Sequence, residues 1–179
     1  MNYPFTLKIS SVTNLSDARY AAGAWANYLG FCCDPSNTNY IDPNKMKEIK
    51  AWVNGPEIVL EFNKQPLEWI SDFCHEIKPN AIQIPLEFYN PQLIELQLKI
   101  ILEVSSISTI PVGITELITS DSDIAKHYTN SGYTVMYQIE NLNEDIKDYN
   151  GIALLGLMED KPGTRDHSNW TAFLEPYMN

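Results

Sequence analysis

Eight short apolar segments recur along the chain, and most of them are continuous rather than alternating with polar residues. Runs of this kind are typical of strands that are covered on both faces of a parallel sheet. The pattern therefore predicts eight parallel strands. We place them at Phe5–Ile9, Tyr28–Cys33, Glu57–Phe62, Ala81–Ile84, Lys99–Val104, Val112–Leu117, Thr134–Ile139 and Ile152–Leu157.

Helix start signals lie between most of these segments. Asp42-Pro43, Gln65-Pro66 and Asn90-Pro91 each place a polar residue at a possible N-cap and proline at the first helical position, which proline suits. Two further starts carry acidic residues in the first turn, where the helix dipole favours them. They are Asn14 with Asp17, and Ser120 before Asp121–Asp123, with Gly132 as a stop for the second.

Repeated strand and helix units with right-handed crossovers form either an open sheet or a closed barrel, and eight strands favour the barrel. We expect one compact (β/α)₈ TIM-type barrel domain over residues 1–179. Such barrels usually need about 200 residues or more. Since only Ser105–Pro111 separates the fifth and sixth segments, we predict that the helix between them is missing or reduced. Ser168–Met178 is predicted to be the closing helix.

Composition and charge narrow the classes of function. The formal net charge of −11 and the scattered distribution of the 12 Lys and Arg residues disfavour binding to nucleic acid. No apolar run approaches the roughly 18 residues of a membrane span, and Met1 to Lys8 do not resemble a secretory signal, so we expect a cytoplasmic protein. Cys32, Cys33 and Cys74 lack metal-ligand spacing, and we expect reduced thiols, no metal site and no cofactor.

Several motifs together resemble the phosphoribosylanthranilate isomerase family. Lys8-Ile9-Ser10-Ser11-Val12-Thr13, followed by Asp17-Ala18, is similar to the family's first strand and helix, which read Lys-Ile-Cys-Gly-hydrophobic-Thr and then Asp-Ala. The other matching segments are Tyr28-Leu29-Gly30-Phe31, Asn39-Tyr40-Ile41-Asp42-Pro43, Ala81-Ile82-Gln83-Ile84 and Pro162-Gly163-Thr164-Arg165-Asp166. The resemblance implies a barrel fold and, in an active member, an Amadori rearrangement in tryptophan biosynthesis.

The family's catalytic groups do not carry over to this sequence. The resemblance places the family's cysteine base at Ser10, and a hydroxyl without a partner is not a useful base. The family's aspartate acid falls, depending on the register, on Glu116, Thr119 or Asp121. Asp121 is equally well explained as a charge at the start of a helix.

The family's substrate contacts are replaced as well. Asn39 stands in place of the arginine that meets the anthranilate carboxylate, and Pro85-Leu86 stands in place of a His-Gly pair. Glu140 adds a carboxylate where the family has a Gly-Gly phosphate turn, and only Gly156 remains near the second phosphate loop. Most of the matching residues can serve structural roles; the matching residues are Thr13, Asp17, Gly30, Tyr40, Pro43, Gln83 and Gly163.

We therefore expect a degenerate barrel without isomerase activity, which acts as a small-molecule binder or as a partner of another protein. The ligand is expected to lie at the barrel mouth, near Lys8, Ser10, Asn39, Gln83 and Gly156, where the strand ends converge with Cys33 and Glu61. The alternative is an enzyme, either an active isomerase or another sugar-phosphate enzyme with relocated catalytic groups. A structural or homo-oligomer-forming subunit is the third possibility, and no nucleic acid or membrane partner is expected.

Overall fold

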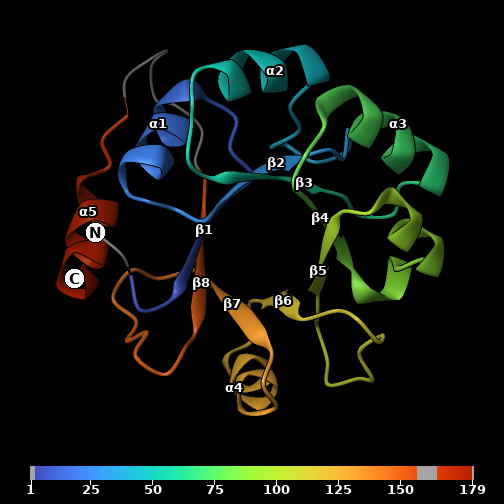
Figure 1. The fold of residues 1–179 in the computed structure, drawn as a ribbon. Coiled ribbons are helices and arrows are strands. Elements are labelled where there is room, and N and C mark those ends of the chain that lie inside the picture. The colour runs from blue at the N-terminus through green and yellow to red at the C-terminus, as the bar shows by residue number, and fades with distance from the viewer. Residues whose placement is uncertain (1–2, 157–164, 179) are drawn as a thin grey trace.

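In the computed structural model, which describes residues 3–156 and 165–178, eight parallel strands close into one barrel (Figure 1). Each strand pairs with its neighbours in chain order, and β1 pairs with β8 to close the ring. The predicted barrel is therefore confirmed. The strands are β1 Thr6–Ser10, β2 Tyr28–Cys32, β3 Glu57–Glu61, β4 Ala81–Pro85, β5 Lys99–Glu103, β6 Glu116–Thr119, β7 Thr134–Ile139 and β8 Gly151–Leu155.

The sixth strand is the one whose position the sequence pattern misplaced. The prediction began it at Val112, but β6 begins at Glu116 and the chain turns at Gly113, where φ is +91°. Val112 is almost fully exposed, whereas Leu117 is fully buried. An apolar residue beside a turn was thus mistaken for the start of a strand.

Helices cover the outside of the barrel (Figure 1). They are α1 Leu15–Gly23, α2 Pro43–Ala51, α3 Leu67–Ile77, α4 Ser122–Asn130 and α5 Ser168–Leu174, with the 3₁₀ segments η1 Leu86–Phe88, η2 Pro91–Leu96 and η3 Glu175–Tyr177. Two predicted caps are confirmed, because Asn14 accepts from the N–H of Asp17 and Asp42 accepts from the first turn of α2. Three starts differ. Pro66 is itself the N-cap of α3, Asn90-Pro91 opens only the 3₁₀ segment η2, and the N-cap of α4 is Asp121 rather than Ser120.

The link between β5 and β6 carries no helix, as predicted, and it packs on the barrel as a loop. Ile114 and Val104 are buried in the main core cluster. The hydroxyl of Tyr128 on α4 accepts from the Ser108 N–H at 2.7 Å and donates to the Ser108 carbonyl at 2.8 Å. These two hydrogen bonds hold the loop against α4, and the outer face of β5 is covered by the chain's own residues.

Three asparagines reinforce the N-terminal end of the barrel. Each precedes a strand and accepts a hydrogen bond, through Oδ1, from a backbone N–H in the preceding strand. Asn27 bonds Leu7 at 2.9 Å, Asn80 bonds Ile58 at 2.9 Å, and Asn150 bonds Val135 at 2.8 Å. These contacts satisfy backbone donors at strand ends, where the sheet ladder does not reach them.

The apolar core has two parts. The larger lies between the barrel and its helices, and the smaller fills the inside of the barrel. The inner cluster consists of Tyr28, Val59, Ala81, Ile101, Ile118, Met136 and Ala153. It closes the middle of the barrel, so that polar groups above it face only the C-terminal mouth. Over the described residues, the helices are too short to cross a bilayer.

Candidate functional site

A cavity of about 340 Å³ opens at the C-terminal mouth of the barrel, where barrel enzymes hold their active sites. Its walls come from the ends of β1 to β5, β7 and β8 and from the loops that follow β2 and β3. Most of the lining side chains are polar. They are Ser10, Ser11, Cys32, Asp34, Asn37, Asn39, Glu61, Phe62, Asn63, Gln83, Pro85, Glu103, Gln138 and Leu155.

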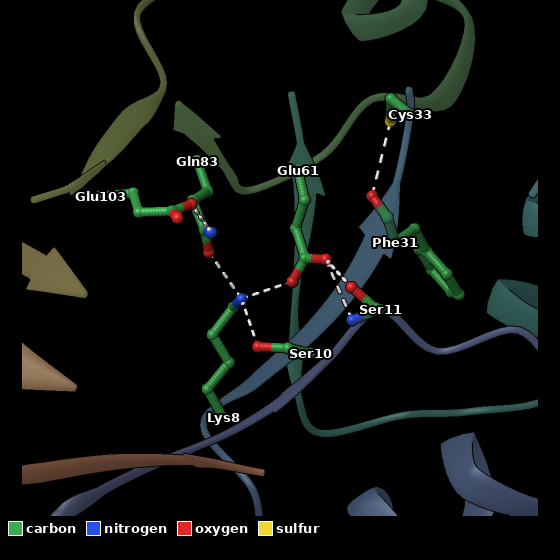
Figure 2. A network of polar contacts seen from close by, with 8 residues as sticks. All are labelled: Lys8, Ser10, Ser11, Phe31, Cys33, Glu61, Gln83 and Glu103. Atoms are coloured by element: carbon green, nitrogen blue, oxygen red, sulfur yellow. Dashed lines mark hydrogen bonds and ion pairs between the residues drawn. The ribbon is translucent and has the colours of Figure 1, made fainter. Parts of the chain in front are cut away.

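A fully buried lysine organises the floor of this cavity (Figure 2). The Lys8 ammonium group donates to Ser10 Oγ at 2.8 Å, to Gln83 Oε1 at 2.7 Å, and to Glu61 Oε1. The second oxygen of Glu61 accepts from the Ser11 N–H at 3.0 Å and from the Ser11 hydroxyl at 2.8 Å. All three donors of the lysine are therefore used, and its charge is balanced by one carboxylate.

Gly30 in β2 makes room for this ion pair. A Cβ atom at that position would lie 2.0 Å from Glu61 Oε1 and 3.2 Å from Lys8 Nζ. Glycine inside a strand often marks the close approach of another group, and here that group is the buried Lys8–Glu61 pair. The glycine that matches the family's second strand thus serves the site directly.

The structure brings together most of the predicted ligand-binding residues. Ser10, Asn39 and Gln83 line the cavity, and Lys8 lies directly beneath it. Gly156 does not line it. Its N–H donates to the Ser10 carbonyl at 2.7 Å, and a Cβ there would meet the carbonyls of Ser10 and Ser11. Gly156 therefore lets two strand ends approach each other.

The cysteine predicted at the mouth is the wrong one of the adjacent pair. Cys33 is fully buried in the layer between barrel and helices, and its thiol donates to the Phe31 carbonyl, away from the cavity (Figure 2). Cys32 lines the cavity instead. Burial raises the Cys32 pKa to about 11, so at neutral pH this group is a thiol and cannot replace a thiolate base.

Neither predicted acid candidate lies at the mouth as a free carboxyl group. Glu116 begins β6, at the opposite end of the barrel, where both its oxygens accept from the Tyr28 hydroxyl and one pairs with Lys99 at 3.2 Å. Asp121 caps α4 by accepting from the N–H groups of Asp123 and Ile124. β6 itself ends at Thr119, which does not titrate as an acid.

Replacing Asp121 tests its role as a cap. We expect Asp121→Ala to lower the free energy of unfolding by about 1 kcal/mol, the usual loss on removing a side-chain cap. Asp121→Asn keeps an acceptor oxygen and should stay within a few tenths of a kcal/mol of the parent protein. Urea unfolding measures both. Equal losses in the two variants would contradict the cap and indicate that the charge itself is needed.

Asp17, which matches the family's Asp-Ala motif, has a structural role. It is fully buried at the start of α1, and its carboxylate accepts from Arg165 at 2.6 Å and contacts His167 Nε2 at 2.8 Å. These contacts fasten the segment before α5 to α1. His167 is not among the described residues that line the mouth cavity. Of the Pro-Gly-Thr-Arg-Asp match, residues 162–164 lie outside the described residues.

A larger cavity, of about 510 Å³, lies on the outer surface between α3 and η2. Leu67, Cys74, His75 and Leu96 are among its lining residues. Burial raises the Cys74 pKa to about 12, which keeps this thiol protonated. The cavity is remote from the strand ends at which barrels place their chemistry, and we take the smaller mouth cavity as the candidate site.

The molecule is thus a closed eight-stranded parallel barrel with a polar pocket at its C-terminal mouth. Its fold is that of the phosphoribosylanthranilate isomerases. The Thermus thermophilus enzyme matches with a TM-score of 0.77 and 22% identity, over 96% of this chain and 99% of that one. Monomers of the dimeric Thermotoga maritima enzyme match with a TM-score of 0.73 and 23% identity, over 96% and 97%.

More divergent isomerases share the same fold. TrpF from Jonesia denitrificans matches with a TM-score of 0.74 at 14% identity, over 96% of this chain and 95% of that one. No family model and no curated protein matches the sequence. The structural likeness confirms the fold that the sequence resemblance predicted, and at these identities it establishes the fold alone.

Proposed function

We propose that this chain is an isomerase-like barrel that binds a small polar molecule at its mouth and does not isomerise phosphoribosylanthranilate. The observation that carries the proposal is the Lys8 network. Ser10, at the position of the family's base, accepts a hydrogen bond from an ammonium group that also donates to Glu61 and Gln83. A hydroxyl held by a cation is a poor proton acceptor, because the positive charge disfavours its protonation.

The other contacts needed for the reaction point the same way. General acid catalysis needs a titratable group within reach of the substrate, and the described end of β6 offers Thr119 followed by the capping Asp121. The anthranilate carboxylate would meet Asn39, which cannot form the charged bidentate contact of an arginine. What the mouth retains is a preformed set of hydrogen-bonding groups, which suits binding.

The purified chain, incubated with phosphoribosylanthranilate, is expected to form product at less than about 10⁻³ per second. Typical enzymes turn over at about 1–10³ per second. Ser10→Cys alone should not restore turnover, since groups of one catalytic set act together. The Thermus thermophilus isomerase assayed in parallel is the positive control. Product formation by this chain at an ordinary enzymatic rate would refute the loss of activity.

Native mass spectrometry of the gently purified protein tests the binding half of the proposal. A bound small molecule should appear as a mass increment that is lost on denaturation. A protein that carries no such increment, and that gains none from a mixture of cytoplasmic metabolites, would favour the protein-partner or structural role.

An enzymatic role with relocated groups is the second candidate. The observation that favours it is that Lys8, Glu61 and Glu103 lie within one chain of hydrogen bonds at the site where barrels place catalytic residues. Turnover of the molecule found by mass spectrometry, lost in Glu103→Gln, would establish it.

A further inference from the structure

The buried lysine determines which atoms of its neighbours remain for a ligand. An ammonium group can only donate hydrogen bonds, so each atom that faces it must be an acceptor. The hydroxyl oxygen of Ser10 and the amide oxygen of Gln83 therefore point at Lys8. Their donors, the Ser10 hydroxyl proton and the Gln83 amide hydrogens, must therefore be directed elsewhere, and Figure 2 shows the Gln83 amide group between Lys8 and Glu103.

Part of this donor capacity is unused. One Gln83 hydrogen goes to Glu103 Oε2, with a nitrogen to oxygen distance of 3.2 Å, and no acceptor among the described residues takes the second. Within residues 3–156 and 165–178, no acceptor takes the Ser10 hydroxyl proton, although Ser10 is only 3% exposed. A buried donor without a partner costs free energy. Because both residues line the cavity, an acceptor group on a ligand can satisfy them.

The wall above this floor is acidic. The charged residues that line the cavity are Asp34, Glu61 and Glu103, and no lysine or arginine is among the described residues that line it. Glu61 is balanced by Lys8. Among the described residues, Glu103 accepts a side-chain hydrogen bond from the Gln83 amide alone, and no cation lies within ion-pair distance of it.

Asp34 adds a second fixed negative charge. The Ser36 hydroxyl donates to Asp34 Oδ1 at 2.7 Å and the Ser36 N–H donates to the same atom at 2.9 Å, and these bonds hold the Asp34 pKa below its usual value. Asn63 donates to the other oxygen at 3.2 Å, and the nearby charge of Lys64 adds a small effect in the same direction. Asp34 is therefore ionised at neutral pH.

This arrangement opposes phosphate and favours a positive group. Fixed carboxylates repel a dianion, and the net charge of −11 adds to that repulsion. The volume of about 340 Å³ is near the lower end of the roughly 300–1,000 Å³ range of ligand pockets. It suits a molecule of sugar size.

We propose that the mouth cavity binds an unphosphorylated amino sugar or a similar small hydroxylated amine. Its hydroxyl oxygens accept from Ser10 and Gln83 on the floor, and its ammonium group contacts Glu103 on the wall. The inference rests on the proposed binding function and adds the chemical class of the ligand.

Calorimetry with three matched sugars tests this class. Glucosamine is expected to bind with a dissociation constant of about 1 mM or below, which corresponds to roughly −4 kcal/mol or better. Glucose, which lacks the charge, should bind at least tenfold more weakly. Glucosamine 6-phosphate should also bind at least tenfold more weakly, because its phosphate faces the acidic wall.

Charge-neutralising variants locate the contact. Glu103→Gln is expected to weaken glucosamine binding at least fivefold and to change glucose binding less than twofold. Glu48→Gln, an equal change at an exposed helix residue that pairs with Lys45 at 3.6 Å, should alter neither. Ser10→Ala should weaken both sugars, because it removes a floor donor that they share. Unchanged urea unfolding of Glu103→Gln shows that the variant folds.

The outcomes separate this inference from the proposed function. The proposed ligand class would be overturned if glucosamine did not bind at 10 mM, roughly tenfold above its expected dissociation constant. Equal binding of glucose, or tighter binding of glucosamine 6-phosphate, would overturn it as well. A different molecule retained in native mass spectra would leave the binding function standing in each of these cases. Isomerase turnover at an ordinary rate would overturn the proposed function itself, whatever the sugars do.

Discussion

Lys8→Met is expected to lower the free energy of unfolding by about 3–5 kcal/mol, the typical effect of removing one partner from a buried ion pair. Methionine keeps most of the length of the side chain but has no charge and no donor. Glu61, which is 7% exposed, would then keep only its bonds to Ser11, and its charge would be unbalanced. Since domains are stable by about 5–15 kcal/mol in total, this single change removes a large share.

A second substitution separates the charge effect from the loss of packing. In Lys8→Met/Glu61→Gln the neutral amide needs no counter-charge, and its oxygen can still accept from Ser11. We expect the double variant to recover more than half of the loss. Urea unfolding of the four proteins in the cycle gives the coupling energy. Additive losses would show that the lysine acts through packing alone.

The barrel could be predicted from the sequence because its strands are buried on both faces. Continuous apolar runs such as Tyr28–Cys32 and Thr134–Ile139 stand out against the polar helix starts. The pattern was weakest at β6, which is a short strand. The loop before it contains the apolar residues Val112 and Ile114, on either side of the turn at Gly113. Gly113, at the turn itself, is the local signal against a strand that begins at Val112.

The candidate site was predicted only in part. Strand ends placed Ser10 and Gln83 at the mouth, because parallel strands in a barrel all end on one side. Lys8 was expected there as well, but its partner Glu61 is 53 residues away in the sequence. Pairing the two requires the register of three strands. Gly30, in the strand between them, is the one local signal that a large polar contact crosses that point.

Side-chain parity explains the error at Cys33, and the misplaced boundary of β6 explains the error at Glu116. Successive residues of a strand face opposite sides, and in β2 the inward set includes Tyr28 and Cys32, which leaves Cys33 outside. Applying that alternation from Tyr28 onward would have selected Cys32. Glu116 faces the interior as well, but at the start of β6, and the misplaced strand boundary moved it toward the mouth in the sequence-based interpretation.

Gly30→Ala is expected to lower the free energy of unfolding by about 2–4 kcal/mol and to abolish sugar binding at the mouth. Overpacking a filled interior costs about 1–3 kcal/mol, and here the added methyl group also displaces half of a buried ion pair. It would lie 2.0 Å from Glu61 Oε1 and 2.7 Å from Glu61 Cδ, so that the carboxylate must leave Lys8 and move into the cavity.

Two comparisons make this prediction specific. Gly23→Ala is the matched control, because a Cβ at the end of α1 meets nothing within 4 Å, and we expect it to be neutral or to stabilise by up to about 1 kcal/mol. In a Glu61→Ala background the obstructing carboxylate is gone. Gly30→Ala should then lower the free energy of unfolding by less than about 0.5 kcal/mol, because the interaction energy between positions 30 and 61 requires both side chains. An undiminished cost in that background would place the strain in the β2 backbone instead of the ion pair.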